Sequence, residues 1–341
     1  MAVQKIFDKK NVLVTGGAGF IGSHLCDELI KTSKVICIDN FLGGSERNID
    51  HLLANPDFIF IRHDMSEPLD LLAIPELNRF KVKFQGIQEI YNLACPMSPI
   101  DFMQNRIASL LANSVAVINA LEMARQYQAK FMHFSSSVVY GTREVHGGNK
   151  VAETDLGIVD QISERACYDE GKRFAETIVN TYRDYYGLDA KMVRLFRIYG
   201  PRMPINQGHM IPDFVVNALD NKDLVINGDE NFTSSLCYVS DAIDGVLKLM
   251  QSELAGPVNI GSEINVKLTE VAEKIIQKTR SSSKIIHGDR LLFMTELNLP
   301  DTTLAREQLS WMPIVNLDHG LDKTIADLRS SKTIKELPTN W

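Results

Sequence analysis

Tyr168 and Lys172 are the residues of this chain whose types and spacing first suggest chemistry. They stand four apart in RACYDEGKRFAET, so a helix would place both side chains on one face, within reach of one ligand. A free tyrosine has a pKa of about 10, but a nearby ammonium group stabilises the phenolate and lowers that pKa. Upstream, an apolar run ends in three serines at 135–137, and one of these hydroxyls could hold an alcohol against the tyrosine. Local turn formation is the alternative role for the serines.

A glycine-rich turn near the start of the chain predicts a phosphate-binding cradle. In NVLVTGGAGFIGSHL, residues 11–25, a β-branched strand runs into the turn and then into an apolar helix start. The glycines permit a tight turn and close approach to phosphates, and the helix N-terminus offers free N–H groups to an anion. These glycines are Gly16, Gly17, Gly19 and Gly22.

Asp39 adds the second half of a dinucleotide fingerprint. It ends the strand KVICID, 17 residues after Gly22, where a carboxylate can accept hydrogen bonds from the adenosine ribose. Because an acid at this point repels a 2′-phosphate, the pattern indicates NAD rather than NADP. An oxidised nicotinamide would lower the pKa of Tyr168 further, and Lys172 could hold the nicotinamide ribose.

The elements that must position these residues alternate between strands and helices. Strand-like runs occur at 11–16, 34–39, 58–64, 89–94, 131–137 and 190–196, and helical patterns at 105–128 and 167–187. This alternation predicts an α/β fold with a doubly wound parallel sheet of the Rossmann type. After Phe196 the rhythm changes to loops, a short strand at 223–228 and helices near 209–220, 240–253, 267–280 and 317–330. We expect a cofactor domain over 1–196 and a smaller α/β substrate lobe over 197–341, with some chain exchange between them.

Composition excludes several other classes of protein. The net charge of −7 argues against nucleic acid or an anionic membrane as the main partner. No stretch reaches the roughly 18 apolar residues of a membrane span, and MAVQKIFDKK contains no apolar signal core. The five cysteines are scattered without metal-ligand spacing, which predicts reduced thiols, a cytoplasmic location and no bound metal.

Several longer segments resemble the extended short-chain dehydrogenase/reductases that act on nucleotide sugars, and most of all UDP-glucuronate decarboxylases. The resemblance covers nearly the whole chain and rests on these segments: TGGAGFIGSHL, Asp39-Asn40, NLACPMSP, VYG, ACYDEGKR, YGPRM and YVSDAIDGV. It implies tightly bound NAD, a C-terminal lobe that holds a UDP-sugar, and a homodimer through paired long helices. It also implies that Tyr168 takes the proton of the sugar C4 hydroxyl while Ser136 orients that hydroxyl.

The resemblance assigns further residues to the two ligands. The residues implied for NAD are Gly16, Gly19, Phe20, Ile21, Gly22, Asp39, Asn40, Phe41, Gly43, Asp64, Met65, Leu93, Ala94, Asn113, Tyr168 and Lys172. Asp64 falls where relatives bind the adenine amino group, although an acid after a strand is also a common cap. The residues implied for the substrate are Pro96, Ser137, Arg197, Arg202 and Gly208.

This sequence departs from the family pattern at the sugar end. Val138 and Ser137 stand where dehydratases carry a glutamate and an aspartate, and decarboxylases share that glutamate. Ser234 replaces an arginine that helps decarboxylases with the carboxylated sugar. Arg197 replaces an asparagine, and Leu299 an arginine. We hypothesise that Arg197 supplies the missing cation to the diphosphate or to a sugar oxygen; a structural ion pair is the alternative.

These departures favour C4 oxidation of a UDP-sugar, with reduction or epimerisation at C4 or C5, because a valine cannot serve as the acid or base of a dehydratase. Decarboxylation of UDP-glucuronate to UDP-xylose is the alternative. A catalytically idle NAD-binding scaffold is a third hypothesis, and NADH formation on adding a UDP-sugar would exclude it.

Overall fold

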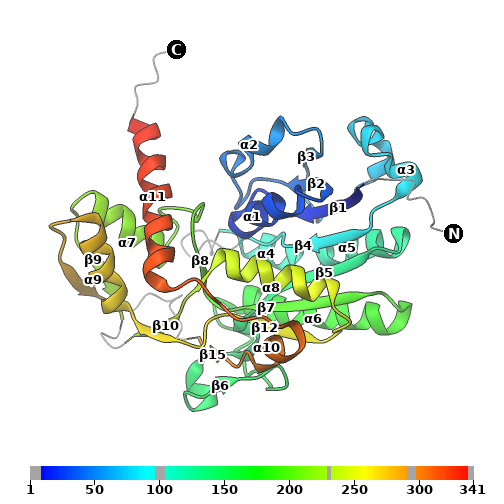
Figure 1. The fold of residues 1–341 in the computed structure, drawn as a ribbon. Coiled ribbons are helices and arrows are strands. Elements are labelled where there is room, and N and C mark those ends of the chain that lie inside the picture. Colours follow the sequence, from blue (N-terminus) through cyan, green and yellow to red (C-terminus); the bar gives the residue numbers. More distant parts are fainter. Residues whose placement is uncertain (1–8, 97–103, 229–231, 290–296, 337–341) are drawn as a thin grey trace.

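A seven-stranded parallel sheet forms the centre of the protein (Figure 1). The computed structural model describes residues 9–96, 104–228, 232–289 and 297–336. The strands lie in the order β12-β7-β5-β4-β1-β2-β3, and every neighbouring pair is parallel. Their bounds are β1 (Lys10–Thr15), β2 (Ser33–Asp39), β3 (Phe58–Arg62), β4 (Glu89–Asn92), β5 (Lys130–Ser136), β7 (Ala190–Leu195) and β12 (Pro257–Ile260). The predicted Rossmann fold is confirmed, although β12 was not among the predicted strands.

Helices cover both faces of the sheet because successive side chains of a strand point to opposite sides. Val12 and Val14 of β1 lie in one buried cluster with α1 (Phe20–Leu29) and α8 (Val239–Gln251). Leu13 lies in the other, with α5 (Val115–Tyr127) and α6 (Ala166–Tyr186). The sheet is therefore a central layer whose carboxyl-terminal edge is left to the loops, where ligands of such folds bind.

The remaining helices are α2 (Asp50–Leu53), α3 (Val82–Gln85), α4 (Arg106–Ala112), α7 (Met210–Leu219), α9 (Leu268–Thr279), α10 (Thr303–Leu309) and α11 (Leu317–Glu336). The short strands are β6 (Lys150–Val151), β8 (Ile198–Tyr199), β9 (Leu224–Asn227), β10 (Thr233–Ser235), β11 (Cys237–Tyr238), β13 (Asn265–Lys267), β14 (Ile285–Gly288) and β15 (Leu299–Pro300). Five 3-10 turns among the described residues complete the elements: η1 (Glu46–Asn48), η2 (Leu71–Ala73), η3 (Pro75–Phe80), η4 (Ser137–Tyr140) and η5 (Arg143–His146).

The second half of the chain contributes to two places. Helices α7, α9 and α11 pack together beside the paired strands β9 and β14, to one side of the sheet (Figure 1). Strand β12 and helix α8 also come after residue 196, yet they belong to the main sheet and its covering layer. The domain boundary at 196/197 stays a prediction, and these two elements cross it.

The helical pattern expected at 105–128 is interrupted at Asn113 and Ser114, so that α4 and α5 are separate helices. Taken together, Arg106–Tyr127 has a mean hydropathy of 1.5 and is long and apolar enough to cross a membrane. The prediction that no stretch reaches this length was therefore wrong. In this structure, 44% of the most apolar 18-residue stretch is buried inside the protein. Core helices of soluble proteins can be equally long and apolar.

Candidate active site

The turn between β1 and α1 has a shape that only glycine permits. Gly16 has a φ of +70°, and a Cβ there would lie 2.8 Å from the backbone nitrogen of Ala94. A Cβ on Gly22 would collide with the carbonyl oxygen of Gly16. Gly19 is the N-cap of α1 and has no side chain to bond the first N–H groups, which include those of Phe20 and Ile21. The open backbone therefore fits the pyrophosphate of a dinucleotide.

Asp39 is buried at the end of β2 and faces this turn. Its carboxylate accepts hydrogen bonds from the backbone N–H groups of Ala18 (3.0 Å) and Phe41 (2.8 Å). Burial raises the pKa of Asp39, and these two bonds oppose the rise. A Cβ on Gly44 would lie 2.9 Å from both carboxylate oxygens, so Gly44 lies close to Asp39, and the cofactor contact of Gly43 stays a prediction. The remaining lone pairs of the carboxylate fit the ribose hydroxyls.

Asp64 and Asn40 form a small hydrogen-bonded group beyond β3. The Asn40 amide donates to Asp64 at 2.8 Å, and Ser66 donates to the same carboxylate through its backbone N–H and its hydroxyl. Burial raises the pKa of Asp64, but these bonds outweigh it and lower the pKa overall. The turn-capping alternative is thus present in the structure, while the adenine role stays a prediction. Met65 is buried nearby.

Asn113 lies at the break between α4 and α5, against the end of β4. Its amide nitrogen donates to the carbonyl of Ser109 (2.9 Å) and to the sulfur of Cys95 (3.3 Å). Its buried amide oxygen has no hydrogen-bond partner among the described residues, so the site offers an acceptor to a ligand. Leu93 and Ala94 press against Gly16 from the same strand end. These features fit the predicted cofactor, but the individual roles remain predictions.

The predicted proton-transfer residues come together. Tyr168 and Lys172 are both buried on α6, and the Lys172 ammonium lies 5.8 Å from the centre of the Tyr168 ring. Lys172 donates to the carbonyl of Phe134 at 2.9 Å, which fixes it beside the end of β5. The side chain of Ser136 hydrogen-bonds Tyr168 and, more weakly, accepts from the N–H of Val138 at 3.4 Å.

The pKa of Tyr168 lies above its usual value in the polypeptide by itself. Burial raises it, Cys95 adds to the rise, and the hydrogen bond to Ser136 only partly opposes both. In the polypeptide without NAD, desolvation of the phenolate decides the direction, and the lowering expected from Lys172 together with an oxidised nicotinamide stays a prediction. The positive ring of an oxidised nicotinamide would have to supply the remaining stabilisation.

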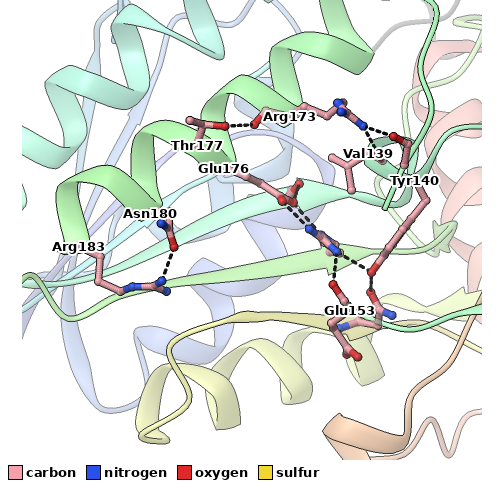
Figure 2. Close-up of polar contacts among 12 residues, drawn as sticks. Val139, Tyr140, Glu153, Arg173, Glu176, Thr177, Asn180 and Arg183 are labelled. Carbon is pink, nitrogen blue, oxygen red and sulfur yellow. Dashed lines mark hydrogen bonds and ion pairs between the residues drawn. The ribbon is translucent and has the colours of Figure 1, made fainter. Parts of the chain in front are cut away.

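An ion pair and several hydrogen bonds hold α6 against β5 and β7 (Figure 2). Glu176 binds Arg194 of β7 through both carboxylate oxygens, at 2.7 and 2.9 Å, and also accepts from the hydroxyl of Ser135. Arg194 donates in turn to the phenol oxygen of Tyr140. One turn away, Arg173 donates to the carbonyl of Val139. These contacts tie α6, which carries Tyr168, to β5 and β7.

A buried polar chain beneath the site escaped the sequence analysis. Thr15 donates to Asn92 (2.8 Å), whose amide nitrogen meets a ring nitrogen of His133 (3.3 Å). Burial, with a contribution from Lys172, holds the pKa of His133 well below its usual range. The imidazole is therefore neutral at pH 7, and its other nitrogen has no partner in the described part of the chain. The available signal was a polar residue within or at the end of each of three apolar strands.

The substrate side opens from the same residues. A cavity of about 330 Å³ is lined in part by Val138, Arg165, Asp169 and Leu297. Val138 and Leu297 also pack against Tyr168, so the cavity begins at the proton-transfer set. Ser137 is buried, and its hydroxyl has no partner within the described residues. Pro96 ends the described stretch after β4, and Met97 onward lies outside it.

The other predicted substrate residues lie on the loop after β7. Arg197 is half-buried with a φ of +39°. Burial, and then the charges of Arg165 and Arg143, lower the pKa of Arg197 to about 10. Arg202 instead forms an ion pair with Asp27 of α1 (2.8 Å), and its contact with substrate stays a prediction. Gly208 has a φ of +79° and precedes α7.

Comparison with known proteins places the chain in a family. Residues 12–261 match the model of the NAD dependent epimerase/dehydratase family. The chain belongs to this family, whose members of this architecture are extended short-chain dehydrogenase/reductases that act on nucleotide sugars with NAD.

Particular relatives narrow the comparison. The chain is 37% identical to UDP-glucuronic acid decarboxylase 1 of Arabidopsis thaliana, over 94% of this chain and 70% of the relative. It is 37% identical to UDP-glucuronic acid decarboxylase 6 of the same plant, over 93% and 88%. A solved UDP-glucuronic acid 4-epimerase of Bacillus cereus, in complex with UDP-glucuronic acid and NAD, has a TM-score of 0.81, 25% identity and coverage of 94% and 99%. The sequence relatives thus favour the decarboxylase, which the sequence analysis had placed second.

Proposed function

We propose that this protein oxidises C4 of UDP-glucuronate and releases carbon dioxide, giving UDP-xylose. The observation that carries the proposal is the set of Ser136, Tyr168 and Lys172, of which Tyr168 and Lys172 are buried, beside the cavity that Val138 and Leu297 line. The choice of substrate is supported by relatives named decarboxylases that align with 93% or more of the chain.

The residues of this chain would orient the sugar C4 hydroxyl and take up its proton. Ser136 would hold the C4 hydroxyl, Tyr168 would take its proton, and Lys172 would hold the cofactor ribose and favour the phenolate. Gly16, Asp39 and the unpartnered oxygen of Asn113 fit the bound dinucleotide. When bound, NAD would accept the hydride from C4 and later return it, so that the overall reaction is redox-neutral.

Decarboxylation follows from the position of the ketone. A C4 ketone is β to the carboxylate on C5, so the electrons of the breaking C5–C6 bond pass to the ketone oxygen as carbon dioxide leaves. This step needs no protein base, and Val138 therefore does not prevent it. C5 must afterwards take up a proton, and the ketone must be reduced, to give UDP-xylose.

The test is product analysis with UDP-glucuronate labelled with ¹³C at C6. We expect ¹³C to appear as carbon dioxide and bicarbonate in the NMR spectrum, together with UDP-xylose. Label retained in a C4 epimer would contradict decarboxylation. Failure to form NADH with any of a broad panel of UDP-sugars would instead support the idle scaffold.

C4 epimerisation is the second candidate, and the uncharged segment at Ser137 and Val138 favours it. Redox at C4 suffices for such a reaction, and no acidic pair is required. The test is a panel of UDP-hexoses in D₂O, where a C4 epimer or deuterium at C5 indicates this reaction.

We further infer a homodimer and a cytoplasmic location. Exposed apolar side chains gather on the neighbouring helices α4, α5 and α6, among them Ile107 (69% exposed), Leu110 and Phe174. A second copy would cover such a face. Light scattering should give a molecular mass twice that of the chain. The substitution Ile107→Glu should reduce this mass to that of a single chain. The five free cysteines support a reducing compartment.

A further inference from the structure

The cavity beside Tyr168 has two walls that come from separate segments of the chain. One wall is the turn η4 with Val138 and Gly141, and the other lies within 158–165, just before α6. The two walls touch through their backbones, because Gly141 forms a parallel β-bridge with Ile158. Gly141 has a φ of +80°, and a Cβ on it would collide with the carbonyl oxygen of Ile158. Since no side chain fits between the walls there, the two backbones set the width of the cavity.

Side chains from three other segments bind the carbonyl groups at the end of η4. Arg173 of α6 donates to the carbonyl of Val139 at 3.2 Å (Figure 2). The next two carbonyls along the chain accept from His146 (2.9 Å) and from the amide of Asn298 (3.1 Å). Carbonyls at the end of a short helix need such partners. Among these three donors, Arg173 comes from the helix that carries Tyr168, so it ties this wall to the proton-transfer set.

Arg173 also binds the second wall. Its guanidinium donates to the carbonyl of Gly157 at 2.8 Å, directly before the lining residues of that wall. The same nitrogen, Nη1, makes the bonds to Gly157 and Val139, and it carries a hydrogen for each. The Nε of Arg173 lies 3.5 Å from the carboxylate of Glu170 on the same helix, which steadies the guanidinium. One side chain of α6 therefore holds both walls.

The wall that Arg173 holds also contacts the proton-transfer residues. Val138 packs against Tyr168, and its N–H donates to the hydroxyl of Ser136 at 3.4 Å. Asp169 lines the cavity and stands four residues before Arg173, so the two share one face of α6. A sugar whose C4 hydroxyl reaches Tyr168 would therefore extend its other groups between the two walls.

We propose that Arg173 is a positioning residue, which sets the width of the sugar subsite by holding both walls of the cavity to the helix of Tyr168. This inference rests on the proposed UDP-sugar substrate. Loss of the two carbonyl bonds would let the walls move and would weaken sugar binding in the ground state and the transition state alike. Such a loss raises KM more than it lowers kcat. The nucleotide is not the part that carries the reacting hydroxyl, so its binding should be unaffected.

The experiment compares UDP with UDP-glucuronate on the NAD-loaded, full-length protein. Arg173→Met keeps the apolar stem but removes both hydrogen bonds. We expect KM for UDP-glucuronate to rise about fivefold or more and kcat to fall less than about threefold. UDP affinity by calorimetry and NAD content should be unchanged. Arg173→Lys, which retains a donor, should recover most of the loss, and Arg173→Gln replaces Arg173→Met if the latter fails to fold.

Arg183→Met is the matched control, because Arg183 also lies on α6 and donates to a backbone carbonyl, that of Ala255, away from the cavity. It should leave KM unchanged.

Two results would overturn the inference alone. An unchanged KM in Arg173→Met, whatever its unfolding temperature, would reduce Arg173 to a structural tie. An equal loss of affinity for UDP and for UDP-glucuronate would show that the two walls do not enclose a sugar subsite. If the wild type binds UDP-glucuronate but releases no carbon dioxide, the proposed function fails, and calorimetry with the two ligands still tests Arg173. If it binds no UDP-sugar, both proposals fail.

Discussion

The cofactor end and the sugar end of this site are built in different ways. The cofactor end uses backbone: the Gly16 N–H donates to the carbonyl of Ile38 at 2.8 Å, and Asp39 accepts from two backbone N–H groups. The sugar end uses long side chains that arrive from separate segments, such as Arg143 and Arg197.

The difference explains where this chain departs from its relatives. A turn made of backbone collides with almost any side chain added to it, so the cofactor end tolerates little change. A cation held at the tip of a flexible side chain can be lost from one strand and supplied from another at small cost. Ser234, which stands where the family resemblance leads us to expect an arginine, illustrates such a loss.

The two ends meet at Tyr168, where we expect the largest effect. Tyr168→Phe removes only the phenolic oxygen, so turnover should fall roughly 10²–10⁴-fold, the range for loss of a general base. Bound NAD and UDP affinity should both be unchanged, as measured by released cofactor and by calorimetry. The control is Tyr182→Phe, also on α6, which removes a hydrogen bond to Glu122 away from the site. Undiminished conversion by Tyr168→Phe would contradict the proposed chemistry.

The second-largest effect is expected from Gly16→Ala, which should weaken NAD binding at the cofactor end. The substitution forces an alanine to a φ of +70° and places its Cβ against Ala94. We expect the purified protein to retain less than about a tenth of its NAD, because the turn must shift. Gly256→Ala is the matched control, since a Cβ there meets nothing within 4 Å. Full NAD content in Gly16→Ala would show that the turn is not the cofactor cradle.

What the sequence predicts follows the same division. The strands β1 to β5 and β7, and the Tyr168–Lys172 face of α6, were predicted because strand and helix periodicities are local. Gly16 and Asp39 were identified for the same reason, since the fingerprint lies within one βαβ unit. The break at Asn113 was missed, because the apolar pattern runs through it unchanged.

Contacts between distant segments could not be predicted. Arg143 and Thr233 are 90 residues apart, and a single sequence contains no sign of their bond. The chain Thr15–Asn92–His133 joins three strands that become neighbours only in the folded sheet. Burial likewise decides the pKa of Tyr168, and the Tyr/Lys spacing says nothing about burial.

Arg197→Ala tests the sugar end without touching the cofactor end. We expect UDP-sugar binding or turnover to fall more than tenfold while NAD content stays intact, because the cation is needed only at the sugar end. Arg125→Ala, on the exposed face of α5, should change neither quantity. Parallel loss of NAD would mean that the two ends are coupled and that Arg197 holds the fold instead.

The smallest effect is expected at a side-chain clasp that holds the sugar end together. Glu263 pairs with Lys150 of β6 and accepts from the N–H (2.9 Å) and hydroxyl (2.7 Å) of Thr302. Burial raises the pKa of Glu263, but these bonds outweigh it and lower the pKa to about 2. The ionised carboxylate therefore stabilises the folded protein above the unfolded pKa of roughly 4.3, and this stability is lost as the pH falls toward 2.

Glu263→Gln should lower the free energy of unfolding by about 1–2 kcal/mol at pH 7, a value reduced for partial exposure of the pair. Urea titrations should show the difference from wild type shrinking between about pH 5 and pH 2, as the carboxylate protonates first in the unfolded chain and then in the folded protein. Hydrogen exchange should quicken at 297–302 but not at 10–22, because backbone bonds hold the latter. Uniform quickening would mean that the two ends unfold as one cooperative unit, so that they differ in construction but not in stability.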